Sequence, residues 1–275
     1  GASMIRFDSA GAIVEARSIL TGTKYNCSGG RSPSDTWLSC EEIDRGQVWE
    51  CDPTGVTTAV ARPAMGRFQH EAAATDYWRK VIYMTEDEPD GALYRFTPTN
   101  WPDLSAGRLD LLVDVGDGTV DWAEVPDPAP LYVGTRTRYQ VPNTKVFNGG
   151  EGICVDSRGC LFFTTKGDNR VWAFDPDDRR LEIIYDAPTA PLPKNLSGVD
   201  NLTVHGNGIL YVAEDGGNMQ VVALGAAQED IAVIQVTGVT SSDITGPAFS
   251  PDGTRFYFSS QRNPGRTYEV TGPWP

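Results

Sequence analysis

Short apolar or alternating segments recur along the whole chain, and polar turns separate them. Clear examples are 80–87 (KVIYMTED), 91–98 (GALYRFTP), 160–167 (CLFFTTKG) and 208–217 (GILYVAEDGG). Gly, Asp, Asn or Pro bound these segments, and such residues favour turns between strands. Helical periodicity over long stretches is absent. The pattern therefore predicts an all-β protein built of many short strands.

The predicted strands follow a repeat of roughly 45 residues. In the clearest copy, Glu71 stands where one apolar strand begins and Glu86 stands where the next strand ends. The same frame gives four further pairs, which are Asn26 with Glu41, Glu151 with Lys166, Asp200 with Glu214, and Thr245 with Gln261. A repeat of this length made only of strands is typical of the blades of a β-propeller.

Counting the copies predicts five blades in a single domain, residues 1–275. The last segment, 245–275, supplies only three strands. We expect segment 12–20 (AIVEARSIL) near the N-terminus to complete that blade, because this closure removes open sheet edges. Residues around 117–142 are rich in Pro and are predicted to form an insertion. Six blades are the alternative, if the insertion folds as an irregular blade.

The first polar residue of each copy is expected to face the central channel of the propeller. These residues are Asn26, Glu71, Glu151 and Asp200. Carboxylates that meet within a few Å stay ionised only if a cation neutralises them, so their convergence predicts a metal site. Taken singly, each acid also has an ordinary explanation as a solvated turn residue.

The second polar position contains acidic pairs, namely Glu41–Glu42, Glu86–Asp87 and Glu214–Asp215. We expect one member of a pair to reach the channel and the other to hold turn amides. Cys40 precedes the first pair. Its thiolate would suit iron, whereas carboxylates alone would suit calcium, and a small buried residue is the alternative role. Lys166 shares the second position, so it is expected to face the channel and bind phosphate, unless it is an ordinary surface charge.

Composition removes several classes of function. The formal net charge of −14 argues against nucleic acid as a partner, because its phosphates would be repelled. No apolar run reaches the length of a membrane span. The 2 histidines disfavour a His-rich zinc or copper site and favour oxygen-ligated ions such as Ca²⁺. The 5 cysteines form no CxxC pair, which disfavours structural zinc. The sequence leaves open whether Cys154 and Cys160 form a disulfide or are two buried thiols.

Five longer segments are distinctive: NCSGGRSPSDTWLSCEE (26–42), VIYMTEDEPDGALYRF (81–96), FFTTKGDNRVWAFD (162–175), LYVAEDGGNM (210–219) and ITGPAFSPDGTRFYFSSQR (244–262). They resemble the PhoX-type alkaline phosphatases and their shorter relatives. The resemblance implies a propeller that holds Ca²⁺ and an iron centre in its channel and hydrolyses phosphomonoesters. It also implies export to the periplasm or the extracellular space. No signal peptide is visible, and residues 1–4 look like a cloning remnant.

The resemblance further implies an iron-ligand role for Cys40, as the Cys of the CEE motif. The metal ligands implied in the same way are Glu41, Glu71, Glu86, Glu151 and Asp200. Two features depart from the family pattern. The chain is much shorter than the full-length enzymes, and Gly150 precedes Glu151 where we expect an Arg that grips phosphate. Phosphate binding would then depend on Lys166 or another loop cation.

The sequence thus favours a metal-dependent phosphoric-ester hydrolase that acts on small phosphomonoesters as a monomer. Calcium is the expected metal and iron the second, with Lys166 and Glu151 as catalytic residues. Two alternatives remain open. One is a calcium-dependent propeller hydrolase of lactones or phosphotriesters, and the other is a non-catalytic propeller that binds metal.

Overall fold

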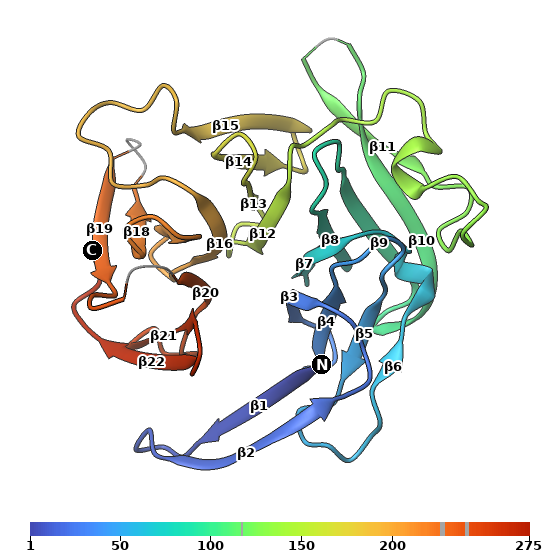
Figure 1. Ribbon diagram of the computed structural model, residues 1–275. Coiled ribbons are helices and arrows are strands. Elements are labelled where there is room, and N and C mark those ends of the chain that lie inside the picture. Colours follow the sequence, from blue (N-terminus) through green and yellow to red (C-terminus); the bar gives the residue numbers. More distant parts are fainter. Residues whose placement is uncertain (117, 226–228, 240–241) are drawn as a thin grey trace. The chain divides into compact units, whose positions relative to one another are not determined.

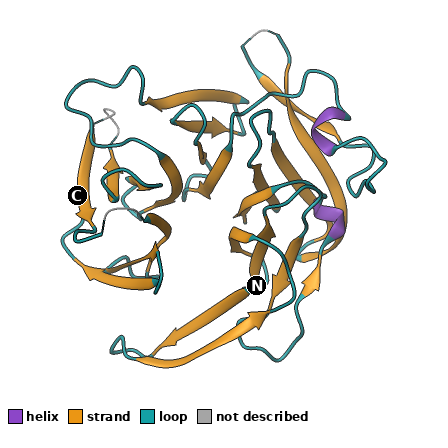
Figure 2. Cartoon of the chain, viewed as in Figure 1, coloured by secondary structure: helices purple, strands orange, loops and turns teal. Residues whose placement is uncertain are grey.

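The computed structural model describes residues 1–116, 118–225, 229–239 and 242–275. Within these ranges the chain is all-β, and its helices are two short 3-10 turns, η1 (Pro63–Met65) and η2 (Thr137–Tyr139) (Figures 1 and 2). None of the described helices is long and apolar enough to cross a membrane. Residue 117, where the predicted insertion begins, lies outside the described ranges.

Five sheets of the blade type follow one another along the chain. The first two blades consist of β3 (Asn26–Arg31), β4 (Trp37–Glu41), β5 (Val48–Cys51) and β6 (Val60–Ala61), and of β7 (His70–Asp76), β8 (Val81–Glu86), β9 (Leu93–Asn100), β10 (Asp103–Asp114) and β11 (Val120–Glu124). The third and fourth blades consist of β12 (Gly150–Val155), β13 (Leu161–Thr165), β14 (Arg170–Asp175) and β15 (Arg180–Asp186), and of β16 (Val199–Val204), β17 (Leu210–Glu214), β18 (Gln220–Leu224) and β19 (Asp230–Gln235). The fifth blade consists of β20 (Asp243–Phe249), β21 (Arg255–Gln261) and β22 (Arg266–Thr271). The predicted all-β, five-bladed propeller class is confirmed.

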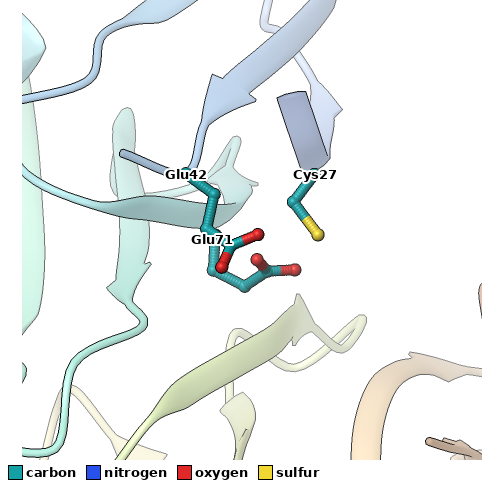
Figure 3. Close-up of side chains that lie close together, drawn as sticks. All are labelled: Cys27, Glu42 and Glu71. Carbon is teal, nitrogen blue, oxygen red and sulfur yellow. The ribbon is translucent and has the colours of Figure 1, made fainter. Parts of the chain in front are cut away.

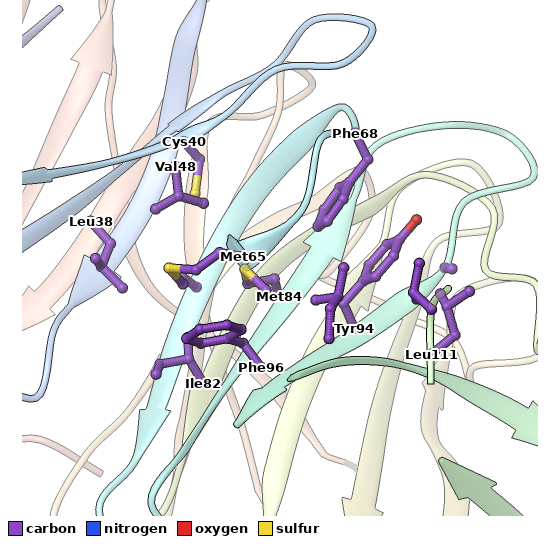
Figure 4. Packing of buried hydrophobic residues seen from close by; sticks show 14 of the residues in the cluster. Leu38, Cys40, Val48, Met65, Phe68, Ile82, Met84, Tyr94, Phe96 and Leu111 are labelled. Carbon is purple, nitrogen blue, oxygen red and sulfur yellow. The ribbon is translucent and has the colours of Figure 1, made fainter. Parts of the chain in front are cut away.

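The chain divides into two compact units. Unit 1 consists of Gly1–Asp114 and Asp121–Val146 and contains the first two blades. Unit 2 consists of Val115–Val120 and Phe147–Pro275 and contains the other three blades. In unit 1, apolar side chains of β4, β8 and β9 pack into one core with Met65 and Phe68 (Figure 4). All six residues of β8 are buried, which is typical of a strand covered on both faces.

The closure expected at the N-terminus was wrong in its pairing. β2 (Ile13–Leu20) pairs with β1 (Ala2–Phe7) in a two-stranded sheet of their own, and the described part of the last blade has three strands. The turn between β1 and β2 explains the local choice. Asp8 Oδ1 accepts hydrogen bonds from the amides of Ala10 and Ala12, each at 2.9 Å. Because a short loop costs little closure entropy, this hairpin forms more readily than a pairing across the whole chain.

The Pro-rich insertion contributes both a strand and an anchored loop to unit 1. β11 pairs with β10 and widens the second blade to five strands. The following loop is fixed by Arg45, which donates hydrogen bonds to the carbonyl oxygens of Pro130, Tyr132 and Gly134 at 3.4, 3.3 and 2.8 Å. The insertion is therefore held at defined points of the blade surface.

The first strands of neighbouring blades within a unit lie very close to each other. In unit 1, a Cβ atom on Gly30 of β3 would lie 1.9 Å from the carbonyl oxygen of Ala73 in β7. In unit 2, a Cβ atom on Gly152 of β12 would lie 2.6 Å from Cα of Asn201 in β16. Only glycine permits this spacing, and the spacing brings side chains from successive first strands together.

Candidate metal centre and charged groups

A β-bulge interrupts the first strand of every blade at the place where the candidate site residues stand. In the first three blades the strands begin with the pairs Asn26↔Glu41, His70↔Glu86 and Gly150↔Thr165, and the register shifts directly after these pairs. The same shift follows Val199↔Glu214 in the fourth blade and Thr245↔Ser259 in the fifth. A bulge inserts an extra residue and re-aims the neighbouring side chain.

In the first blade, the residue that is structurally equivalent to Glu71 therefore lies one position after the residue that the sequence repeat predicted. The residues that follow the paired positions are Cys27, Glu71, Glu151 and Asp200. Cys27 thus takes the position that the repeat assigned to Asn26. The Asn26 side chain instead accepts a hydrogen bond from the N-terminal amine of Gly1 at 2.7 Å and donates one to Ser39 Oγ at 3.0 Å.

The candidate metal centre of unit 1 consists of Cys27, Glu42 and Glu71. One ligand atom of each residue lies within 4.8 Å of those of the other two, and Figure 3 shows the three side chains converging. Cys27 belongs to β3, Glu42 follows β4, and Glu71 belongs to β7. Glu71 is 1% exposed, whereas Cys27 is exposed to solvent. The group is thus buried on one side and accessible on the other.

The donor set of this centre fits a metal ion. One thiol and two carboxylates combine a soft ligand with two hard ones, and such a mixed set suits iron better than calcium. Three protein ligands would also leave coordination positions for water or substrate, as in catalytic metal sites. Like charges held this close need a cation or a proton to neutralise them.

Cys40 is not part of this group. It is fully buried in the apolar core of unit 1, next to Leu38 and Val48 (Figure 4). Burial, together with the negative charge of Glu71, raises the pKa of the Cys40 thiol well above its ordinary value. A thiol in such surroundings is inert, so the alternative role of Cys40, a small buried residue, matches its placement. None of the five cysteines, all of which lie in the described ranges, forms a disulfide, and this includes Cys154 and Cys160.

The first member of each acidic pair holds backbone amides of its own blade. Glu41 accepts hydrogen bonds from the amides of Lys24 and Gln47 at 3.1 and 3.2 Å. Glu214 does the same for Ser197 and Gln220 at 2.7 and 3.1 Å. These carboxylates therefore serve the turns of the blades, as expected for one member of each pair.

Glu86, the third of these carboxylates, joins the second blade to the insertion. It accepts hydrogen bonds from the Ala92 amide at 3.2 Å and from the Tyr94 hydroxyl at 2.9 Å. Its other oxygen lies 2.7 Å from Arg138 Nη1, and both side chains are buried. Burial raises the pKa of Glu86 to about 7, although Arg138 and Tyr94 oppose the shift. Glu86 is thus a structural partner of Arg138 and does not contribute to the metal centre.

A second charged group lies in unit 2, around Lys166. Its ammonium nitrogen is 3.7 Å from Glu151 Oε1 and 3.9 Å from Asp200 Oδ2, and it pairs still more closely with Asp215. Partial burial disfavours the charge, but the hydrogen bond to Asp215 and the charges of Glu151 and Asp200 outweigh it and raise the pKa of Lys166. The ammonium is therefore permanently charged at neutral pH.

The carboxylates of this group do not all ionise alike. Burial raises the pKa of Asp200 to about 7, against the lowering effect of Lys166. Asp243 and Asp215 share a hydrogen bond that raises the pKa of Asp243 to about 6 and lowers that of Asp215. Near neutral pH, Asp215 is therefore the charged partner that Lys166 meets at closest range.

Sequence reasoning missed Cys27 as a ligand and did not decide which member of each acidic pair reaches a site. In the first and fourth blades the second member does so, since Glu42 joins the metal centre and Asp215 joins the Lys166 group. The acidic pairs were the available signal. The bulge was not visible in the sequence, because it changes neither the length of the repeat nor its pattern of apolar residues.

Comparison with known proteins supports the family resemblance. Residues 43–160 match the model of the family described as Alkaline phosphatase PhoX, which confirms the resemblance over a stretch that includes Glu71 and Glu151. Among the curated proteins, none matches the chain.

Solved structures of several proteins share the fold. The chain is similar to PhoX of Pseudomonas fluorescens, solved in complex with vanadate, a transition state analogue. The TM-score is 0.73 at 20% identity, over 93% of this chain and 67% of that chain. It is also similar to TolB of Acinetobacter baumannii (TM-score 0.59, 13% identity, 98% and 57% covered) and to the gluconolactonase XC5397 of Xanthomonas campestris (TM-score 0.54, 14% identity, 88% and 70% covered). At these identities the similarity establishes the fold.

Proposed function

We propose that this chain is a metal-dependent phosphoric-ester hydrolase that acts on small phosphomonoesters. The observation that carries the proposal is the group of Cys27, Glu42 and Glu71, in a chain whose residues 43–160 match the PhoX alkaline phosphatase family. A thiol and two carboxylates arranged for one ion, partly open to solvent, fit a catalytic metal centre better than a closed structural one.

Cys27, Glu42 and Glu71 would hold the ion, and iron is the metal that their mixed donor set favours. When bound, the ion would act as a Lewis acid toward a phosphoryl oxygen and lower the pKa of a coordinated water. Glu71, buried in β7, fixes one side of the centre, while the exposed Cys27 leaves the other side accessible. Calcium, the other metal that the family resemblance suggests, would need an oxygen-rich set.

Lys166 and Glu151 are proposed as the further catalytic residues. The Lys166 side chain is 43% exposed, so its ammonium can donate a hydrogen bond to a phosphate oxygen while its partners hold it in place. Glu151 is buried beside it and orients the ammonium at 3.7 Å. Lys166 would thus provide the positive charge that an Arg before Glu151 would otherwise supply. We further infer that the protein acts as a monomer and, by its family, outside the cytoplasm.

The test is hydrolysis of a chromogenic phosphomonoester by the purified chain before and after chelation. We expect chelation to abolish turnover, iron to restore it, and Glu71→Gln to lower kcat/KM by at least about 100-fold. Glu124→Gln makes the same charge change at an exposed position of β11 and should leave the rate unchanged. Turnover that resists both chelation and Glu71→Gln would contradict the proposal. So would hydrolysis of a lactone or phosphotriester without hydrolysis of the monoester.

A further inference from the structure

Three carboxylates of unit 2 converge on a single ammonium group. Glu151 Oε1 and Asp200 Oδ2 lie 3.7 and 3.9 Å from Lys166 Nζ, and Asp215 forms the closest pair. The carboxylates come from β12, from β16 and from the residue after β17, so the shape of three strands determines their meeting. Glu151 is only 3% exposed, so water can solvate little of its charge.

Carboxylates brought together in this way normally coordinate a divalent cation. Here an ammonium occupies the point to which they are directed. A lysine ammonium is a positive charge without any acceptor atom. All three carboxylates lie within ion-pair distance of it, and Asp215 is its hydrogen-bond partner among them. An additional divalent cation at the same point would be repelled by the ammonium and would have to displace it from Asp215.

Register shows how Lys166 comes to occupy this point. Lys166 follows the pair Gly150↔Thr165, and Asp215 follows the pair Val199↔Glu214. Glu42, a member of the candidate metal centre of unit 1, follows the pair Asn26↔Glu41. The third blade thus carries a cation at the position where the first and fourth blades carry an acid.

We propose that Lys166 is a built-in counter-ion that replaces a metal ion among Glu151, Asp200 and Asp215. This assignment departs from the ligand roles that the family resemblance suggested for Glu151 and Asp200. It rests on the geometry of unit 2 alone and does not depend on the proposed hydrolase activity. Its consequence is that this charge cannot be removed by chelators and that the chain binds fewer divalent ions than its carboxylates suggest.

The experiment is calorimetric titration of Ca²⁺ into the full, chelator-treated chain, with elemental analysis of the dialysed protein. Lys166→Met keeps the length of the side chain and removes its charge. We expect this variant to bind one more Ca²⁺ per chain than the wild type and to gain thermal stability from Ca²⁺ that the wild type does not gain. Lys166→Arg, which keeps the charge, should match the wild type. So should Lys145→Met, since Lys145 pairs with the exposed Asp114 at 3.5 Å.

A folded Lys166→Met variant with unchanged Ca²⁺ stoichiometry would overturn the proposal. A second measurement covers the case in which that variant fails to fold. In the wild-type background, Glu151→Gln and Asp200→Asn should leave the number of bound divalent ions unchanged. A loss of one ion in either variant would show that a metal occupies the group in spite of Lys166, and would also overturn the proposal. Neither result depends on whether the chain hydrolyses phosphate esters.

Discussion

Partners decide what each carboxylate of this protein does. Glu86 and Glu71 belong to the same blade but have different surroundings. Glu86 contacts Arg138, the Tyr94 hydroxyl and a turn amide. Glu71 lies close to Cys27 and Glu42. Arg138 could not be connected with Glu86 from the sequence, because the two lie 52 residues apart and Arg138 belongs to a Pro-rich segment. The sequence repeat identified Glu86 as a candidate site residue, but only its contact with Arg138 shows that its role is structural.

Arg138→Ala tests this reading of Glu86. Removing the guanidinium leaves a buried carboxylate without its cation, and we expect a loss of about 3–5 kcal/mol of unfolding free energy at pH 8. The pKa of Glu86, about 7 in the folded protein, is above its ordinary value, so its protonated form is the favoured one when buried. The contribution of protonated Glu86 to the stability of the folded state is therefore complete below about pH 4.5, and it is lost as the pH rises through 7.

Without Arg138 that pKa rises further, so the loss should be clearly smaller at pH 5 than at pH 8 in urea titrations. The matched control is Arg136→Ala, which breaks a pair with Asp44 in which both side chains are more than one third exposed. Its cost should stay below about 1 kcal/mol at both pH values. Equal costs for Arg138→Ala at the two pH values would contradict the assignment.

At the scale of the strands, the repeat and most strand positions were predictable, because apolar runs and turn residues report them directly. Bulges and hairpins were not. A shift of one residue turns a side chain to the other face of a sheet, and the bulge after Asn26 therefore exchanges Asn26 for Cys27. The N-terminal hairpin was also missed, since its pairing depends on the Asp8 turn and on residues taken for a cloning remnant.

Close approach of the first strands gives a prediction at this scale. Gly152→Ala places a methyl group against the backbone of Asn201 and Leu202, both 2.6 Å away, and should cost about 1–3 kcal/mol of unfolding free energy. Gly206→Ala is the control, because nothing lies within 4 Å of its Cβ position and its φ is ordinary. Its effect should lie within about 0.5 kcal/mol. Urea denaturation of both variants measures the two losses of unfolding free energy. Similar losses would contradict the close spacing of β12 and β16.

At the scale of the whole molecule, five blades carry two different means of balancing negative charge. Unit 1 has the group of Cys27, Glu42 and Glu71, which fits a metal ion, and unit 2 has a lysine among its carboxylates. An ion bound only by the folded state would add stability in proportion to the logarithm of its concentration. The acids of both units were predictable from the sequence, but only the three-dimensional register distinguishes the candidate metal centre from the lysine counter-ion.

The most direct test of the account is elemental analysis of the wild-type protein beside Cys27→Ser and Cys40→Ser, each checked for folding by its thermal transition. We expect the wild type and Cys40→Ser to retain a bound transition metal, iron by preference, and Cys27→Ser to lose at least about 90% of it, a tenfold or larger effect. Cys40→Ser should be less stable instead, because a hydroxyl replaces a thiol in the apolar core. A wild type that binds no metal, or a Cys27→Ser variant that retains its metal while Cys40→Ser loses it, would contradict the account.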